Sequence, residues 1–224
     1  MSHLIDHLQS FDRKERSVVL QNVLNYESNS VDLSKAFAES IQVALDGDPI
    51  VPTKVMLGID YHLDWIELAL LCTSDPGISM RRPFKHPTAQ QINANQQDID
   101  ILIAFDALVN GNKLTYLIMI EAKAFTGWNN EQLRSKAERL RAIFGDEDGL
   151  NYSGIALPRF ILMSPKESER VEHAQWPSWM KPQGKPLWMV FDLPVRVQAT
   201  RCEHDGKRSA KGQYLRLDSV SSNR

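Results

Sequence analysis

Residues 98–124 read DIDILIAFDALVNGNKLTYLIMIEAKA, with apolar runs on both sides of a turn. The first run, Asp98 to Phe105, predicts a strand, and Asn110-Gly111-Asn112 is a strong signal for a hairpin turn. The return strand is predicted from Leu114 to Ala124, antiparallel to the first. Its centre, Leu117 to Ile120, is continuously apolar, which is typical of a strand buried on both faces.

Two charged residues, Glu121 and Lys123, interrupt the apolar return strand. Because they are two positions apart, their side chains project from the same face of the strand. Charged groups in such a strand are costly unless they are paired or bind a metal. A structural ion pair explains these two residues alone. The combination with Asp100, which opens the partner strand, and with a helix directly afterwards is more specific.

The elements around this hairpin predict an α/β protein with a central mixed sheet, arranged as an α/β/α sandwich with an N-terminal helical extension. Helical spacing of apolar residues predicts four helices: from near Asp12 through Val19, Leu20, Val23 and Leu24, at Leu33 to Leu45, at Asp60 to Leu71 and at Asn130 to Phe144. Further strands are predicted at Arg159 to Met163 and at Leu187 to Phe191. We expect one domain over residues 1–224, with N-terminal helices in 1–50, a core in 55–195 and a C-terminal extension in 196–224.

The composition, with 42% hydrophobic and 24% charged residues in 224, is that of an ordinary soluble protein. No segment approaches the roughly 18–20 apolar residues that a membrane span needs. The first residues lack the apolar centre of a secretory signal, so a cytoplasmic protein is expected. Neither Cys72 nor Cys202 lies in a metal-binding spacing.

The formal net charge of −2 argues only weakly against a nucleic-acid enzyme, because binding responds to local patches. The sequence has two basic clusters. The first comprises Arg81, Arg82, Lys85 and His86. The second comprises Lys207, Arg208, Lys211 and Arg216, for which solvated surface is the favoured interpretation.

Asp100 followed by Glu121-Ala122-Lys123 resembles the signature of the PD-(D/E)XK, restriction-endonuclease-like nucleases, with Ile99 in place of the motif's proline. Residues from about Ile59 to Phe191 fit the helix-sheet-helix core of that superfamily. The resemblance implies hydrolysis of phosphodiester bonds in DNA with Mg²⁺, or Mn²⁺ in its place. Asp100 and Glu121 would be the metal's carboxylate ligands, and the Ala122 carbonyl a further one. Lys123 would orient the attacking water or stabilise developing charge.

The resemblance also implies an acid from the helix before the sheet. Asp60, Asp64 and Glu67 share one face of the predicted helix, where like charges repel unless a cation lies opposite. Asp64 and Glu67 are the candidates, and the choice between them is open.

Some exonuclease-like members carry a glutamine on the helix after the lysine strand, where this chain has Gln132. Equally, Asn129 and Gln132 have the spacing of a helix capping box. Lys136 and Arg139 follow on the same helix face. The residues expected to bind nucleic acid are Arg81, Arg82, Lys85 and Lys136.

Three interpretations follow for the function. The first is a Mg²⁺-dependent nuclease, with DNA as the expected partner, no membrane and a homodimer left open. The second is a catalytically inactive nucleic-acid-binding or assembly module of the same fold. The third is an unrelated α/β protein in which Glu121 and Lys123 only pair. The intact Asp100, Glu121 and Lys123 favour the first.

Overall fold

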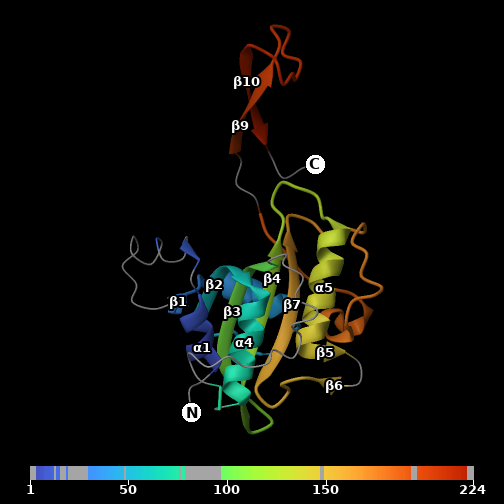
Figure 1. Ribbon diagram of the computed structural model, residues 1–224. Helices are drawn as coiled ribbons and strands as arrows, with labels where there is room; N and C mark the ends of the chain where they lie inside the picture. The colour runs from blue at the N-terminus through green and yellow to red at the C-terminus, as the bar shows by residue number, and fades with distance from the viewer. Residues whose placement is uncertain are drawn as a thin grey trace.

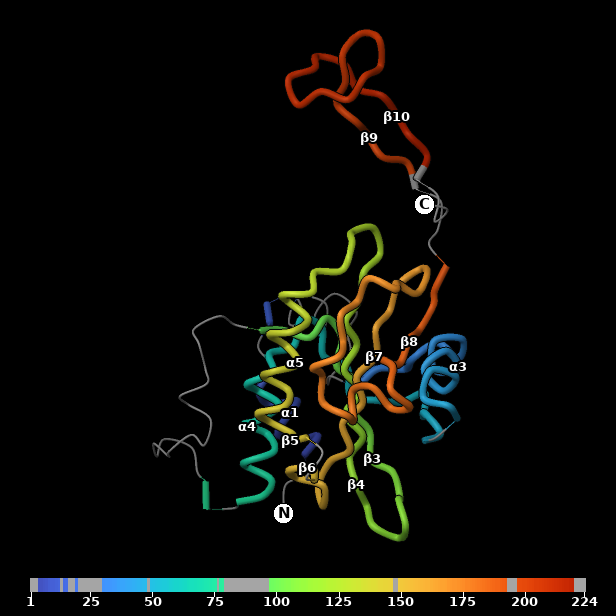
Figure 2. Tube along the Cα trace, turned by 90° about the vertical axis from the view of Figure 1, so that its right-hand side faces the viewer, coloured from blue at the N-terminus to red at the C-terminus, as the bar shows by residue number. Residues whose placement is uncertain are grey.

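The computed structural model describes residues 4–12, 14, 15, 19, 30–47, 49–75, 77–78, 97–146, 149–192 and 196–220 (Figures 1 and 2). Most of the helix predicted from near Asp12 and the basic cluster at residues 81–86 lie outside these residues. None of the helices in the described part is long and apolar enough to cross a membrane.

A mixed sheet of six strands in the order β1-β2-β3-β4-β7-β8 forms the centre of the molecule (Figure 1). Its strands are β1 (Ser30–Asp32), β2 (Lys54–His62), β3 (Asp98–Val109), β4 (Asn112–Ala122), β7 (Ala156–Ser164) and β8 (Leu187–Val190). The pairs from β1 to β4 are antiparallel, whereas β4, β7 and β8 run parallel. The predicted hairpin is confirmed, with Asn110 and Gly111 at φ of 50° and 80°, the left-handed backbone that a tight hairpin turn requires.

Helices cover both faces of the sheet. In the described residues they are α1 (Leu4–Phe11), α3 (Lys35–Ala44), α4 (Leu63–Ser74) and α5 (Asn130–Phe144). Leu8 of α1, Leu70 of α4 and Leu140 of α5 belong to one core, together with Leu117 and Met119 of β4. On the opposite face, α3 packs against the second core, which includes the β4 residues Ile118 and Ile120. The predicted α/β class with a mixed central sheet is therefore confirmed, and so is the burial of the β4 centre on both faces.

Short elements follow α5. They are β5 (Gly145–Asp146), β6 (Gly149–Leu150), and the 3₁₀ turns η1 (Ser178–Met180) and η2 (Pro182–Gly184). Because α5 connects two parallel neighbours, β4 and β7, its N-terminal turn lies near the end of the sheet where β4 stops.

The predicted helix from Asp60 to Leu71 begins later than expected. Asp60 lies in β2 with a φ of 52°, which a right-handed helix does not tolerate, and α4 starts at Leu63. The acidic stripe predicted over Asp60, Asp64 and Glu67 is therefore wrong in its first member. The two N-terminal helices that the structure describes also form no common layer, because α1 and α3 pack on opposite faces of the sheet.

The C-terminal segment forms a separate hairpin of β9 (Arg196–Cys202) and β10 (Tyr214–Val220). Figures 1 and 2 both show it standing apart from the central sheet. The sequence indicated only an extension here.

Candidate active site

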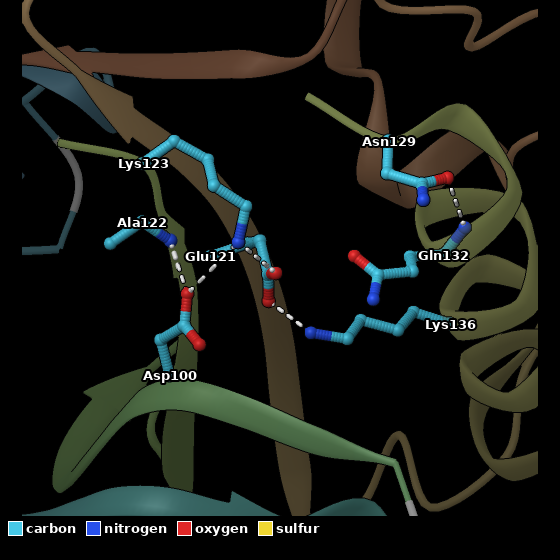
Figure 3. A network of polar contacts seen from close by, with 7 residues as sticks. All are labelled: Asp100, Glu121, Ala122, Lys123, Asn129, Gln132 and Lys136. Carbon is cyan, nitrogen blue, oxygen red and sulfur yellow. Dashed lines mark hydrogen bonds and ion pairs between the residues drawn. The ribbon is translucent and has the colours of Figure 1, made fainter. Parts of the chain in front are cut away.

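The ends of β3 and β4 bring the three predicted residues together. The hairpin register pairs Ile101 with Ile120, so Asp100 and Glu121 are the next residues along the two strands. Lys123 follows β4 directly, and its amide nitrogen donates to the Met163 carbonyl at 2.8 Å. Figure 3 shows the three side chains turned toward one another.

Asp100 is held by backbone and remains accessible. Its Oδ2 accepts a hydrogen bond from the Ala122 amide at 2.7 Å and lies 3.9 Å from Lys123 Nζ. The side chain is 33% exposed. Ala122 thus enters the site through its amide nitrogen, and a ligand role for its carbonyl oxygen stays a prediction.

Glu121 is a buried carboxylate with an ammonium group on each oxygen. Its side chain is only 4% exposed; Lys123 Nζ lies 3.1 Å from Oε1, and Lys136 Nζ contacts Oε2 (Figure 3). A buried carboxylate without such partners would cost several kcal/mol. The structural ion pair considered from the sequence therefore exists, and it is part of a larger cluster of two acids and two lysines.

Aromatic side chains border this cluster. Lys123 Nζ lies 5.9 Å from the centroid of the Trp128 ring, within the range of a cation–π contact. Trp128 packs edge to face on Trp188 of β8, with ring centroids 5.5 Å apart. These rings exclude water from one side of the lysine and strengthen its electrostatic interactions.

Gln132 combines features of both of its predicted roles. Asn129 is the N-cap of α5, and its side chain accepts from the amides of Glu131 and Gln132 at 2.9 and 3.2 Å. The Asn129 part of the capping prediction is confirmed. Figure 3 shows the Gln132 side chain pointing toward Glu121 and Lys136 rather than back toward Asn129. Its placement at the candidate site, but not a catalytic role, follows from this view.

Asp64 and Glu67 are bound by a cation of α5. The Nη2 atom of Arg139 lies 2.6 Å from both Asp64 Oδ1 and Glu67 Oε2. The side chains of Glu67 and Arg139 are 2% and 7% exposed, so this is a buried ion cluster. Glu67 also raises the pKa of the Tyr152 hydroxyl, after the larger effect of partial burial. The helix acids thus reach α5, and a role for either one as metal ligand stays a prediction.

Sequence reasoning missed these partnerships of α5. Lys136 was expected to bind nucleic acid, but it contacts Glu121, and Arg139 is the cation that the acidic helix face required. The spacing of Gln132, Lys136 and Arg139 at i, i+4 and i+7 was the available signal.

A second charged group went unnoticed close to Asp100. Asp98 opens β3 and contacts His62 Nδ1 and, at 2.7 Å, Lys14 Nζ. This group joins the starts of β3 and α4 to the segment after α1. The remaining predicted contacts, Arg81, Arg82 and Lys85, lie outside the described residues.

The donor set suits a hard divalent cation. Mg²⁺ prefers oxygen ligands, keeps several waters and is typically bound through one or two carboxylates, which Asp100 and Glu121 provide. Among the described residues, no three or more His, Cys, Asp or Glu side chains gather closely enough to form a complete protein cage for a metal. Comparison of the chain with models of protein families, with curated proteins and with solved structures found no match.

Proposed function

We propose that this protein is a metal-dependent nuclease that hydrolyses phosphodiester bonds in DNA, with Asp100, Glu121 and Lys123 at its active site. One observation carries the proposal: two carboxylates, one accessible and one buried, lie within 3.9 Å of the same Lys123 ammonium at the end of a buried hairpin. A purely structural pair requires only Glu121 and one lysine. The additional, partly exposed Asp100 is the feature expected of a site that binds a ligand.

The arrangement of the strands supports assignment to the restriction-endonuclease-like fold. An antiparallel β3–β4 hairpin leads through α5 to the parallel strand β7, with helices on both sides of the sheet. The proposed active site lies where β4 hands over to α5, so it is built on rigid elements. Rigid support of this kind is what preorganised catalytic groups need.

In the proposed reaction, one P–O bond forms to a water oxygen while the bond to the leaving sugar oxygen breaks. That leaving oxygen then takes up a proton. Asp100 and Glu121 would hold Mg²⁺, which supplies a Lewis acid for the phosphate and lowers the pKa of water. Lys123 would donate to the water or to a phosphate oxygen, and its position between two carboxylates keeps it cationic.

An inactive binding module is the second candidate, and the double occupation of Glu121 favours it. Both carboxylate oxygens contact lysines, so a metal ligand role requires at least one of these contacts to be exchanged. A module that binds phosphates only through lysines would need no such exchange. Cleavage separates the two candidates directly.

We expect the full-length protein to cleave DNA in 5 mM Mg²⁺, a concentration chosen for the assay, and not in excess EDTA. Linear duplex, closed circular and single-stranded DNA should be compared, with RNA of the same sequence. Nicking or linearisation of the circle would show endonucleolytic cleavage. Stable binding of all substrates with no cleavage in Mg²⁺ or Mn²⁺ would support the inactive module and overturn the nuclease.

A further inference from the structure

The C-terminal hairpin is the basic part of an otherwise acidic chain. Residues 196–220 contain six Lys or Arg and three Asp or Glu, whereas the whole chain contains 26 and 28. The hairpin thus has a formal charge of +3 and the remainder −5. Such an asymmetry is typical of a segment that binds a polyanion.

Three of the cations are available for a partner. Asp205 pairs with Lys207 at 3.0 Å, and Asp218 pairs with Arg216 at 2.8 Å. In contrast, Arg201, Arg208 and Lys211 are exposed and form no ion pair with any residue in the described part of the chain.

One face of the hairpin is apolar and uncovered. The register places Leu215 opposite Arg201 and Leu217 opposite Ala199. Val197, Leu215 and Leu217 are 68%, 70% and 73% exposed. A lone two-stranded hairpin is at best marginally stable in water, so a partner that covers this face would stabilise it.

The hairpin begins close to the candidate active site. Ala122 pairs with Met163, and the adjacent Ser164 pairs with Val190, so β8 ends at the same edge of the sheet as β4. Only residues 191–195 separate Val190 from Arg196, which limits that distance to about 20 Å. The hairpin can therefore reach DNA whose phosphate lies at Asp100 and Glu121.

We propose that the β9–β10 hairpin is a DNA-binding arm that enters the major groove next to the cleaved bond. The major groove of duplex DNA admits a two-stranded β-ribbon, in which arginine can contact guanine and apolar side chains can contact thymine methyl groups. Arg201 among Leu215 and Leu217 provides both kinds of contact, and Arg208 and Lys211 are the phosphate contacts. This inference rests on the proposed function, since it assumes that the active site engages DNA.

Binding of a fluorescein-labelled duplex in EDTA tests the arm without cleavage. The arm variant replaces Arg201, Arg208 and Lys211 with serine. A control variant replaces Lys35, Lys54 and Lys113 with serine, which removes the same charge from the opposite end of the sheet. Anisotropy should be measured from 50 to 200 mM salt, with circular dichroism confirming that each variant is folded.

We expect the slope of log affinity against log salt to become shallower by about 3 in the arm variant, about 0.9 for each lost phosphate contact. The control should keep the wild-type slope. Equal slopes in arm variant and control would overturn the arm. It would also be overturned if serine at Leu215 and Leu217 converted a dimer to a monomer in sedimentation and left DNA affinity unchanged, because the apolar face would then bind a second copy. Binding through the arm without cleavage in Mg²⁺ would refute only the nuclease, and cleavage with equal slopes would refute only the arm.

Discussion

Asp100→Asn is expected to lower the rate of Mg²⁺-dependent DNA cleavage by at least about 10²- to 10³-fold, the scale of losing one preorganised electrostatic group. Asparagine can still accept the hydrogen bond from the Ala122 amide, which lies 2.7 Å from Oδ2 in the wild type. The substitution therefore removes a metal ligand and a charge and keeps the local backbone contact. Initial cleavage rates of variant and wild type on the same DNA measure the effect.

Stability measurements with Asp100→Asn separate a catalytic from a structural carboxylate. Because Asp100 is partly exposed and 3.9 Å from Lys123, its loss should change stability by no more than about 1 kcal/mol. Millimolar Mg²⁺ should raise the melting temperature of the wild type by mass action, and much less that of the variant. Asp106→Asn is the matched control, since Asp106 lies near the other end of β3 and accepts from Thr115 at 2.7 Å. A large loss of melting temperature in Asp100→Asn, with no response of the wild type to metal, would instead identify a structural cluster.

Arg139→Met is expected to destabilise the fold by about 3–5 kcal/mol, because it leaves the buried Glu67 carboxylate without its cation. For a chain of this size, each kcal/mol corresponds to a decrease of roughly 2–4 °C in melting temperature. Adding Glu67→Gln should recover a large part of the loss, since removing both partners leaves no uncompensated charge. Thermal and denaturant unfolding of the single and double variants measure these changes.

Arg134→Met is the control for Arg139→Met on the same helix. Arg134 pairs with Glu172 at 3.4 Å, with both side chains at least half exposed, so its loss should cost less than about 1 kcal/mol. Equal effects of the two substitutions would mean that the buried cluster contributes no more than a surface pair. If Glu67→Gln alone left stability unchanged but weakened Mg²⁺ binding, Glu67 would be a metal ligand rather than a partner of Arg139.

The central hairpin and its charged residues were predictable because each depends on local sequence. Asn110-Gly111 requires a tight turn, and the apolar runs on both sides fix the register that brings Asp100 beside Glu121. The predicted helix Asn130–Phe144 matches α5 at both ends, since Asn129 caps its start and Gly145 follows its end.

Other elements were missed because their signals are weak or depend on distant partners. In β2 the apolar run Val55 to Leu57 is short and Gly58 follows, so the strand is specified mainly by pairing with β3. The β9–β10 hairpin has a long connection and alternation that includes Arg201, and neither is a strong strand signal. The contact of Lys136 with Glu121 arises only when α5 packs on the sheet, and sequence spacing alone does not define the facing residue.

The most direct test of the proposed active site is anomalous diffraction from crystals of the full-length protein soaked in Mn²⁺. The proposal predicts an anomalous peak in contact with carboxylate oxygens of both Asp100 and Glu121, with at least one lysine displaced from Glu121. No peak at this position in millimolar Mn²⁺, with Lys123 and Lys136 still bound to Glu121, would contradict a metal-dependent active site.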